Sequence, residues 1–236
     1  MTGRGSSCVE TPSTASRRRK AFRATKTTRP IPALGGCDFV ANPERRADEV
    51  SVFWQPELLG NVIPLGPGPP GTGPPILYEP WRWPGRKHAL ATADSVQIIL
   101  DGDSERHRLL LSGLEPPRDG AALGLVLDRS PFWRARLDAA ARFLAAVGQH
   151  LPGIRTPPPP RLSNERHDRL TAMLWALDLR GAGASEHEIA GMTLGTVVTG
   201  PAWSDHPDRG EVRRLLAEAS TLVAGGYRRL LAPPSR

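Results

Sequence analysis

The stretch ASEHEIAGMTLGTVVTGPAWSDHPDRGEVRRLLAEASTLVAGGYRRLL, residues 184–231, organises the rest of the chain. It opens with Ser185-x-x-Glu188, the spacing of a capping box. In that motif the serine hydroxyl accepts from the Glu188 amide, and the glutamate reaches back to the serine N–H. The pattern therefore predicts a short, well-capped helix, and we expect it to turn Ile189, Ala190 and Met192 inward.

Residues 191–208 are expected to form a long irregular connection. They contain Gly195, Gly200, Pro201 and Pro207, so one continuous helix is excluded. A connection of this length inside a compact domain is uncommon and indicates a specific role.

The final helix is expected to begin near Asp208, a reasonable N-cap. Apolar residues at helical spacing predict its buried side: Val212, Leu215, Leu216, Ala219, Leu222 and Val223. At about 100° per residue the opposite side carries Gly210, Arg214, Ala217 and Thr221, flanked by Arg213 and Ser220.

Two helices around such a connection are typical of a helix-turn-helix with a lengthened turn. Small residues beside an arginine suit a helix that enters the major groove, where the arginine contacts guanine or a phosphate. The same periodicity also fits an ordinary amphipathic surface helix with solvated arginines. The pattern by itself leaves both interpretations open.

The preceding sequence predicts an α+β chain, in which a small, mostly antiparallel β domain with one helix comes before this all-α module. Strands are expected at 50–54, 61–65, 87–92, 95–100, 107–111 and 121–127, with a hairpin through residues 101–105. Residues 131–150 have a helical period, with Phe132, Ala135, Ala139, Phe143, Ala146 and Val147 on one face and Arg134, Asp138 and Arg142 off it. In residues 164–180, Leu170, Met173, Leu174 and Leu177 share a helix face.

These patterns predict four segments. Residues 1–36 form a disordered basic tail, and residues 37–151 form a β-rich domain that ends in a helix. Residues 152–162 are a proline-rich linker around TPPPP (156–160), and residues 163–232 are the helix-turn-helix domain.

The net charge of +7 suggests a polyanionic partner. However, residues 1–32 hold eight lysines and arginines against Glu10 alone, so the remaining residues are neutral overall. The tail, with RRRK at 17–20, is either a solvated segment or a non-specific phosphate contact. If the folded part binds DNA, it must therefore do so through local charge placement.

Several chemistries are excluded by spacing, and no cofactor or metal is expected. GPGPPGTGPP (66–75) lacks the Gly-Lys-Ser/Thr of a phosphate loop. His187-Glu188 has no second histidine where a zinc site needs one, and Asp101-x-Asp103-x-Glu105 lacks the glycine of a calcium loop. No nucleophile elbow appears, so no enzyme is expected. Cys8 and Cys37 have no metal-ligand spacing, and no apolar run predicts a signal or membrane span, so we expect a cytoplasmic protein.

Three ordered segments resemble the RovC-like DNA-binding domain family of bacteria. They are FWQPELLGNVIPLGPGPPG (53–71), ALDLRGAGASEHEIA (176–190) and EVRRLLAEASTLVAGGYRRLL (211–231), and the resemblance covers roughly residues 37–232. It implies an extended-turn helix-turn-helix in a regulator of mobile-element transfer or type VI secretion genes. Some family members resemble antiactivators that bind another regulator instead of DNA, which is the alternative function.

The resemblance implies double-stranded DNA as the partner, with another transcriptional regulator or a second copy of the chain as further partners. Arg209, Arg213 and Arg214 match the family's basic cluster at the start of the last helix, and Arg228 and Arg229 match its basic end. Together with Thr221 on the outward face, these residues are the expected DNA contacts. Glu186 and His187 stand where the family commonly has basic residues, which lowers the expected positive potential there.

Overall fold

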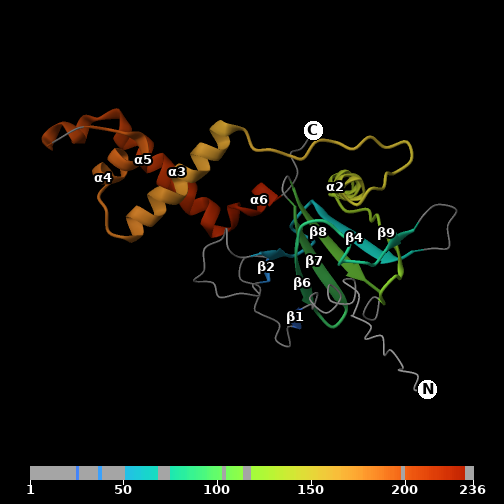
Figure 1. Cartoon of the computed structure of the whole chain (residues 1–236). Coiled ribbons are helices and arrows are strands. Elements are labelled where there is room, and N and C mark those ends of the chain that lie inside the picture. The colour runs from blue at the N-terminus through green and yellow to red at the C-terminus, as the bar shows by residue number, and fades with distance from the viewer. Residues whose placement is uncertain are drawn as a thin grey trace, which may run out of the picture. The chain divides into compact units, whose positions relative to one another are not determined.

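The computed structural model describes residues 51–68, 75–102, 105–113, 118–197 and 200–231, together with strands β1 (Thr25–Lys26) and β2 (Cys37–Asp38) (Figure 1). Apart from these two strands, residues 1–50 lie outside the described part, as do residues 69–74 of the proline-glycine run. The prediction of a disordered tail at 1–36 therefore falls mostly outside it, and Thr25–Lys26 pairs with a sheet strand. The chain divides into two compact units, Met1–Pro159 and Pro160–Arg236.

A seven-stranded mixed sheet forms the centre of the first unit, in the order β1-β6-β7-β8-β4-β9-β5. Its further strands are β4 (Val62–Pro67), β5 (Ile76–Leu77), β6 (Arg86–Ala91), β7 (Ser95–Asp101), β8 (Arg106–Ser112) and β9 (Ala122–Leu125). β2 pairs separately and antiparallel with β3 (Phe53–Trp54). The predicted strands are thus present, and β7 and β8 pair antiparallel as the predicted hairpin requires.

The expectation of a mostly antiparallel sheet is only partly correct. Strand β4 pairs parallel with β8, so that Ile63 lies opposite Leu109 and Leu65 opposite Leu111. The strand alternation predicted which segments are extended, but it carries no signal for pairing across this distance in sequence.

Helix α2 (Trp133–Ala146) supplies the other half of this unit's core. Ala139, Phe143 and Leu144 are buried with sheet residues such as Ile98 and Leu109. Phe143 also meets the Trp83 ring edge to face, with 5.4 Å between the ring centres. Burial of these side chains, at about 25 cal/mol per Å² of apolar area, is the main force that holds the helix on the sheet.

The predicted α2 face was wrong at two positions. Arg142, expected off the face, is buried, and its Nε donates to Glu105 Oε1 at 2.7 Å. Ala146, expected on the face, is exposed. Glu105, whose carboxylate pairs with Arg142, directly precedes β8. The helical period of α2 carries no information about this partner, so it could not predict a buried arginine.

The second unit is helical, with α3 (Asn164–Gly181), α4 (Glu186–Leu194), the 3₁₀ turn η1 (Gly200–Asp205), α5 (Pro207–Thr221), the π turn η2 (Leu222–Gly226) and α6 (Arg228–Leu231). Helices α3, α4 and α5 pack around one apolar cluster (Figure 1). Its buried members are Met173, Ala176, Ile189, Ala190, Val212, Leu215, Leu216 and Ala219.

Three residues expected on buried faces are exposed. Met192 is 61% exposed because it lies about 200° around α4 from buried Ala190. Leu174 on α3 is 62% exposed, since Met173 and Ala176 take the positions that meet α4 and α5. Val223 is 68% exposed because α5 gives way to the π turn at Leu222, which changes the rotation per residue. No described helix is long and apolar enough to cross a bilayer.

Candidate nucleic-acid interface

The predicted capping box is present at the start of α4. Ser185 Oγ accepts from the Glu188 amide at 3.3 Å, and Glu188 Oε2 accepts from the Ser185 amide at 2.8 Å. The hydrogen bonds that the Glu188 carboxylate accepts from Ser185 lower its pKa below the ordinary value of 4.5. The bond from the Ser185 backbone amide has the largest effect. The carboxylate of Glu188 is thus occupied with the helix end and does not face the arginines of α5.

The connection between α4 and α5 is shorter than predicted, and residues 200–205 of it form the turn η1. Helix α4 continues through Leu194 to a left-handed Gly195, and α5 begins at Pro207 instead of near Asp208. The cap of α5 is His206, whose Nδ1 accepts from the Asp208 amide at 3.2 Å. A histidine cap lies outside the usual serine, threonine, aspartate and asparagine set, so the sequence placed the N-cap at Asp208, two residues too late.

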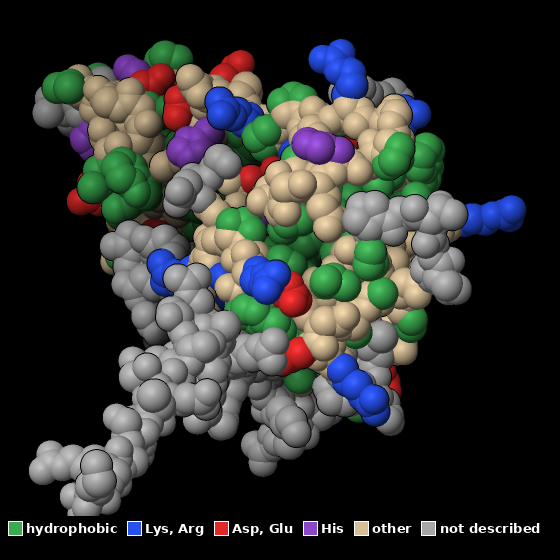
Figure 2. Space-filling model, turned by 45° about the vertical axis from the view of Figure 1, so that its right-hand side comes forward, with side chains coloured by type: hydrophobic (Ala, Val, Ile, Leu, Met, Phe, Trp, Pro, Cys, Tyr) green, Lys and Arg blue, Asp and Glu red, His purple; other side chains and the backbone are tan. Residues whose placement is uncertain are grey.

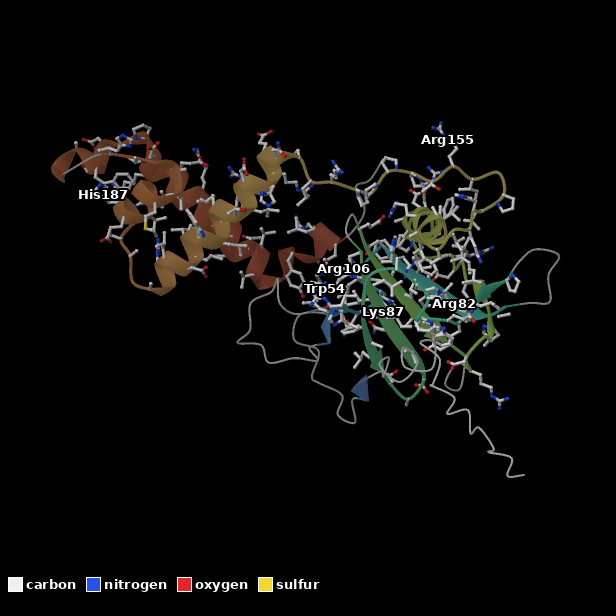
Figure 3. All side chains as sticks on the ribbon, in the orientation of Figure 1. Trp54, Arg82, Lys87, Arg106, Arg155 and His187 are labelled. Carbon is white, nitrogen blue, oxygen red and sulfur yellow. The ribbon has the colours of Figure 1, made fainter. Side chains whose placement is uncertain are left out.

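Trp203 anchors this connection. Its ring contacts the rings of His187 on α4 and of His206, with centre distances of 5.3 and 5.9 Å. Thr196 Oγ1 donates to Asp208 Oδ2, and Arg209 Nη1 donates to the Ser204 carbonyl at 2.9 Å. His187 is labelled in Figure 3, on α4 of the helical unit. The extended connection is therefore a positioned structural element between α4 and α5.

Glu186, at the start of α4, is the centre of an arginine cluster. Arg213 Nε donates to both Glu186 oxygens at 3.1 Å, Arg209 Nε lies 3.8 Å from Oε2, and Arg180 Nη2 lies 3.9 Å from Oε1. We call Glu186, Arg180, Arg209 and Arg213 the Glu186 cluster. It brings together side chains of α3, α4 and α5, and three guanidinium groups there face one carboxylate.

Arg214 points to a different neighbour. Its Nη2 donates to Glu211 Oε2 at 2.6 Å, and Arg169 of α3 reaches both Glu211 and Glu218. The hydrogen bond from Arg214 is the main reason that the pKa of Glu211 falls below its ordinary value. Because the Arg214 side chain is 69% exposed, solvent screens this pair and it adds little to stability.

The remaining predicted contacts lie toward the C-terminal end of the unit. Thr221 is exposed at the end of α5, and its hydroxyl donates to the Ala217 carbonyl at 2.9 Å. Gly225, with φ of +117°, then breaks the helix, and Arg228 and Arg229 stand exposed on α6. The structure therefore separates the arginines of α6 from those at the start of α5 by the whole of α5 and the break.

Beside Thr221 lies a groove of about 450 Å³ in the helical unit. Its lining comes from α3, α5, η2 and α6: Arg166, Arg169, Leu170, Met173, Ala217, Glu218, Thr221, Leu222 and Leu230. Thr221 is thus placed at an apolar groove as well as on the outward face of α5.

Arg180 was missed by the sequence reasoning. It is the basic residue in the last turn of α3 and 29 residues before Arg209 in the chain. A basic residue at a helix C-terminus is ordinarily explained by the helix dipole, so the sequence held no signal of its proximity to Glu186.

We also searched the described residues outside the Glu186 cluster for a metal site. Within the described residues no group of His, Cys, Asp or Glu side chains is arranged to hold a metal ion. On the face shown in Figure 2, the lysine and arginine side chains are scattered among hydrophobic and neutral ones.

Comparison with known proteins defines the class of this domain. Residues 126–232 match the family model described as "T6SS, Transcription factor, DNA binding domain". This part of the chain is therefore similar to a family of DNA-binding domains of transcription factors that is associated with type VI secretion. The family is that of the RovC DNA-binding domain, and the expected family is confirmed over these residues. No curated protein and no solved structure matches the chain.

Proposed function

We propose that this protein is a sequence-specific transcriptional regulator that binds double-stranded DNA through an extended-turn helix-turn-helix formed by α4 and α5. The observation that carries the proposal is the position of Arg209 and Arg213. They lie at the N-terminal end of α5, while the opposite side of that helix is buried against α3 and α4. In helix-turn-helix proteins the N-terminal residues of the recognition helix contact the base edges.

The outward side of α5 suits close approach to DNA. Gly210 and Ala217 are exposed and small, and a Cβ added at Gly210 meets nothing within 4 Å. Arg214 is 69% exposed, so its guanidinium reaches solvent despite its pairing with Glu211. We propose Arg209, Arg213, Arg214 and Thr221 as contacts of α5 and Arg228 and Arg229 as phosphate contacts of α6.

The regulated genes follow from the family description. Because the matched family is associated with type VI secretion, genes of that system are the first targets to examine, followed by genes for mobile-element transfer. The proposed division is a sheet domain at 37–151, a proline-rich linker at 152–162 and the DNA-binding domain at 163–232.

The test is charge reversal on α5. An operator selected from a random-sequence library would be bound by the full chain, and the double variant Arg213→Glu, Arg214→Glu is expected to lose that binding. Each bidentate arginine contact accounts for about 1–3 kcal/mol of base discrimination, and reversal also adds repulsion from the phosphates. The matched control is Arg155→Glu, Arg161→Glu, two exposed arginines outside the helices, with the same change in net charge.

The fold of both variants is checked by circular dichroism and denaturant unfolding. Unchanged operator affinity in a folded Arg213→Glu, Arg214→Glu chain would contradict the proposal. Equal loss in the control would mean that net charge, and not the face of α5, determines binding.

A second candidate function is an antiactivator that sequesters another regulator, and the apolar groove beside Thr221 favours it. This function predicts no selected operator even at low salt, together with co-purification of a regulator. Substitution of Leu170 and Leu222 by serine would then abolish the co-purification, whereas Arg213→Glu would not.

A further inference from the structure

The Glu186 cluster has features that a set of ordinary surface ion pairs lacks. Its three arginines come from two helices distant in sequence, and its single carboxylate comes from the first turn of a third. The carboxylate is the most buried member, with a side chain 27% exposed, whereas Arg180 and Arg213 are 51% and 55% exposed. The carboxylate side chain is therefore less exposed than those of Arg180 and Arg213, which reach solvent.

The hydrogen bonds leave donors available. Arg213 uses Nε for Glu186, and neither of its terminal nitrogens has a hydrogen bond among the described residues. Arg209 donates from Nη1 to the Ser204 carbonyl and its Nε is buried, so Nη2 is its donor without a hydrogen bond among the described residues. A guanidinium group has five N–H donors, so each arginine can keep its contact with Glu186 and still bind a phosphate oxygen.

The charge balance favours an anion. Three positive groups surround one negative group, which leaves two positive charges without a nearby counter-charge inside the cluster. Two arginines in this cluster belong to the proposed recognition helix, so its location coincides with the expected DNA surface.

We propose that the Glu186 cluster is a phosphate-binding site of the DNA interface, in which Arg180 is an additional phosphate contact and Glu186 is a positioning residue. This inference rests on the proposed function and deepens it. Glu186 holds the side chains of Arg209 and Arg213 in one orientation. The two arginines can then bind DNA in only one alignment of the duplex with α5. Glutamate at this position then increases selectivity instead of merely reducing the positive potential.

The first experiment measures the binding of a fluorescent mixed-sequence duplex to the full chain between about 50 and 200 mM salt. Arg180→Ala is expected to weaken binding by about three- to tenfold and to reduce the slope of log affinity against log salt by about 1, as for one lost phosphate contact. Arg161→Ala removes the same charge from an exposed residue outside the cluster, and its slope should equal that of the wild type. Equal slopes for Arg180→Ala and Arg161→Ala would refute the role of Arg180.

The second experiment tests positioning by Glu186. In Glu186→Gln the added net positive charge should raise the affinity for the mixed-sequence duplex. The ratio of operator affinity to mixed-sequence affinity should fall by about tenfold, because freed arginines bind any phosphate within reach. Glu165→Gln is the control, since Glu165 is an exposed acid in the first turn of α3. An unchanged affinity ratio in Glu186→Gln would refute the positioning role.

A third measurement does not depend on DNA. In Glu186→Gln the three arginines lack their anion, so inorganic phosphate should raise the melting temperature of this variant more than that of the wild type, at ionic strength matched with chloride. The additional Arg180→Ala change should reduce the gain. If the wild type binds no duplex at all, the proposed function fails. The melting experiment still tests whether the Glu186 cluster binds phosphate. An equal effect of phosphate on the melting temperatures of variant and wild type would refute phosphate binding by the cluster.

Discussion

At the scale of single residues, the side chains of Ser185 and Glu188 form a capping box at the N-terminal end of α4. Glu188 accepts from the backbone and the hydroxyl of Ser185, and Ser185 accepts in turn from the Glu188 amide. Each bond satisfies a backbone or side-chain donor that has no partner within the helix. Since α4 is short, its stability depends on these bonds and on the packing of Ile189.

The lowered pKa of Glu188 predicts a pH-dependent contribution to stability. The folded chain favours the ionised carboxylate, so this contribution is fully present above pH 4.5 and is lost as pH falls through the lowered pKa. Unfolding by urea is expected to show a wild-type advantage over Glu188→Ala at pH 7 that shrinks toward pH 3. Glu165→Ala serves as the comparison. A Glu188→Ala difference that is constant from pH 7 to pH 3 would contradict this account.

At the scale of elements, the end of α5 is set by glycine. Gly225 has φ of +117°, where side chains are strained, and a Cβ added at Gly226 would lie 2.7 Å from the Thr221 carbonyl oxygen. These two glycines lie at the end of the π turn that follows α5, and they separate α6 from α5. The turn therefore determines that Val223 is exposed and that Arg228 and Arg229 stand apart from Arg213.

Two glycine substitutions should have opposite effects. Gly225→Ala is expected to lower the free energy of unfolding by about 1–2 kcal/mol, because alanine is strained at positive φ. Gly210→Ala, in the exposed first turns of α5 with open space around it, should raise it by about 0.5–1 kcal/mol. Denaturant unfolding of both variants measures the difference. Stabilisation by Gly225→Ala would mean that the break after α5 is not a feature of the folded chain.

At the scale of the whole molecule, charge is divided unequally along the chain. The net charge of +7 equals that of residues 1–32 alone, and the remaining residues are balanced. If residues 33–236, which are neutral overall, bind DNA, they must place their arginines on one surface, as the Glu186 cluster does. The tail and the helical unit are thus expected to contribute differently, the tail by attraction to any phosphate and the unit by selectivity.

Replacement of Arg17, Arg18, Arg19 and Lys20 by serine tests this division. The affinity for a mixed-sequence duplex should fall, and the salt slope should decrease by up to about 3.6, because each of four phosphate contacts contributes about 0.9. Operator affinity should fall by the same factor, so that the selectivity ratio is unchanged. Fluorescence anisotropy with both duplexes gives the two numbers. A loss of selectivity would show that the tail reads sequence, contrary to this division of roles.

Several features were determined by the sequence alone, because they depend on neighbours within a few residues. The capping box needs only Ser185 and Glu188, and strand alternation over 95–100 and 107–111 needs only a period of two. The position of the recognition-helix candidate followed from Val212, Leu215, Leu216 and Ala219, all of which are buried. The resemblance to the RovC DNA-binding family was likewise readable from ordered segments. The family match confirms it over 126–232, which includes the segments 176–190 and 211–231 but not 53–71.

The tertiary structure decided what depends on partners distant in the chain. The parallel pairing of β4 with β8, the burial of Arg142 against Glu105, and the meeting of Arg180 with Glu186 all join residues whose separation no local period encodes. Helical and strand periods report which side of an element is apolar, but not which charge stands opposite it. For the same reason Glu186 looked like a loss of positive potential in the sequence, whereas its three arginine neighbours make it the centre of a cationic cluster.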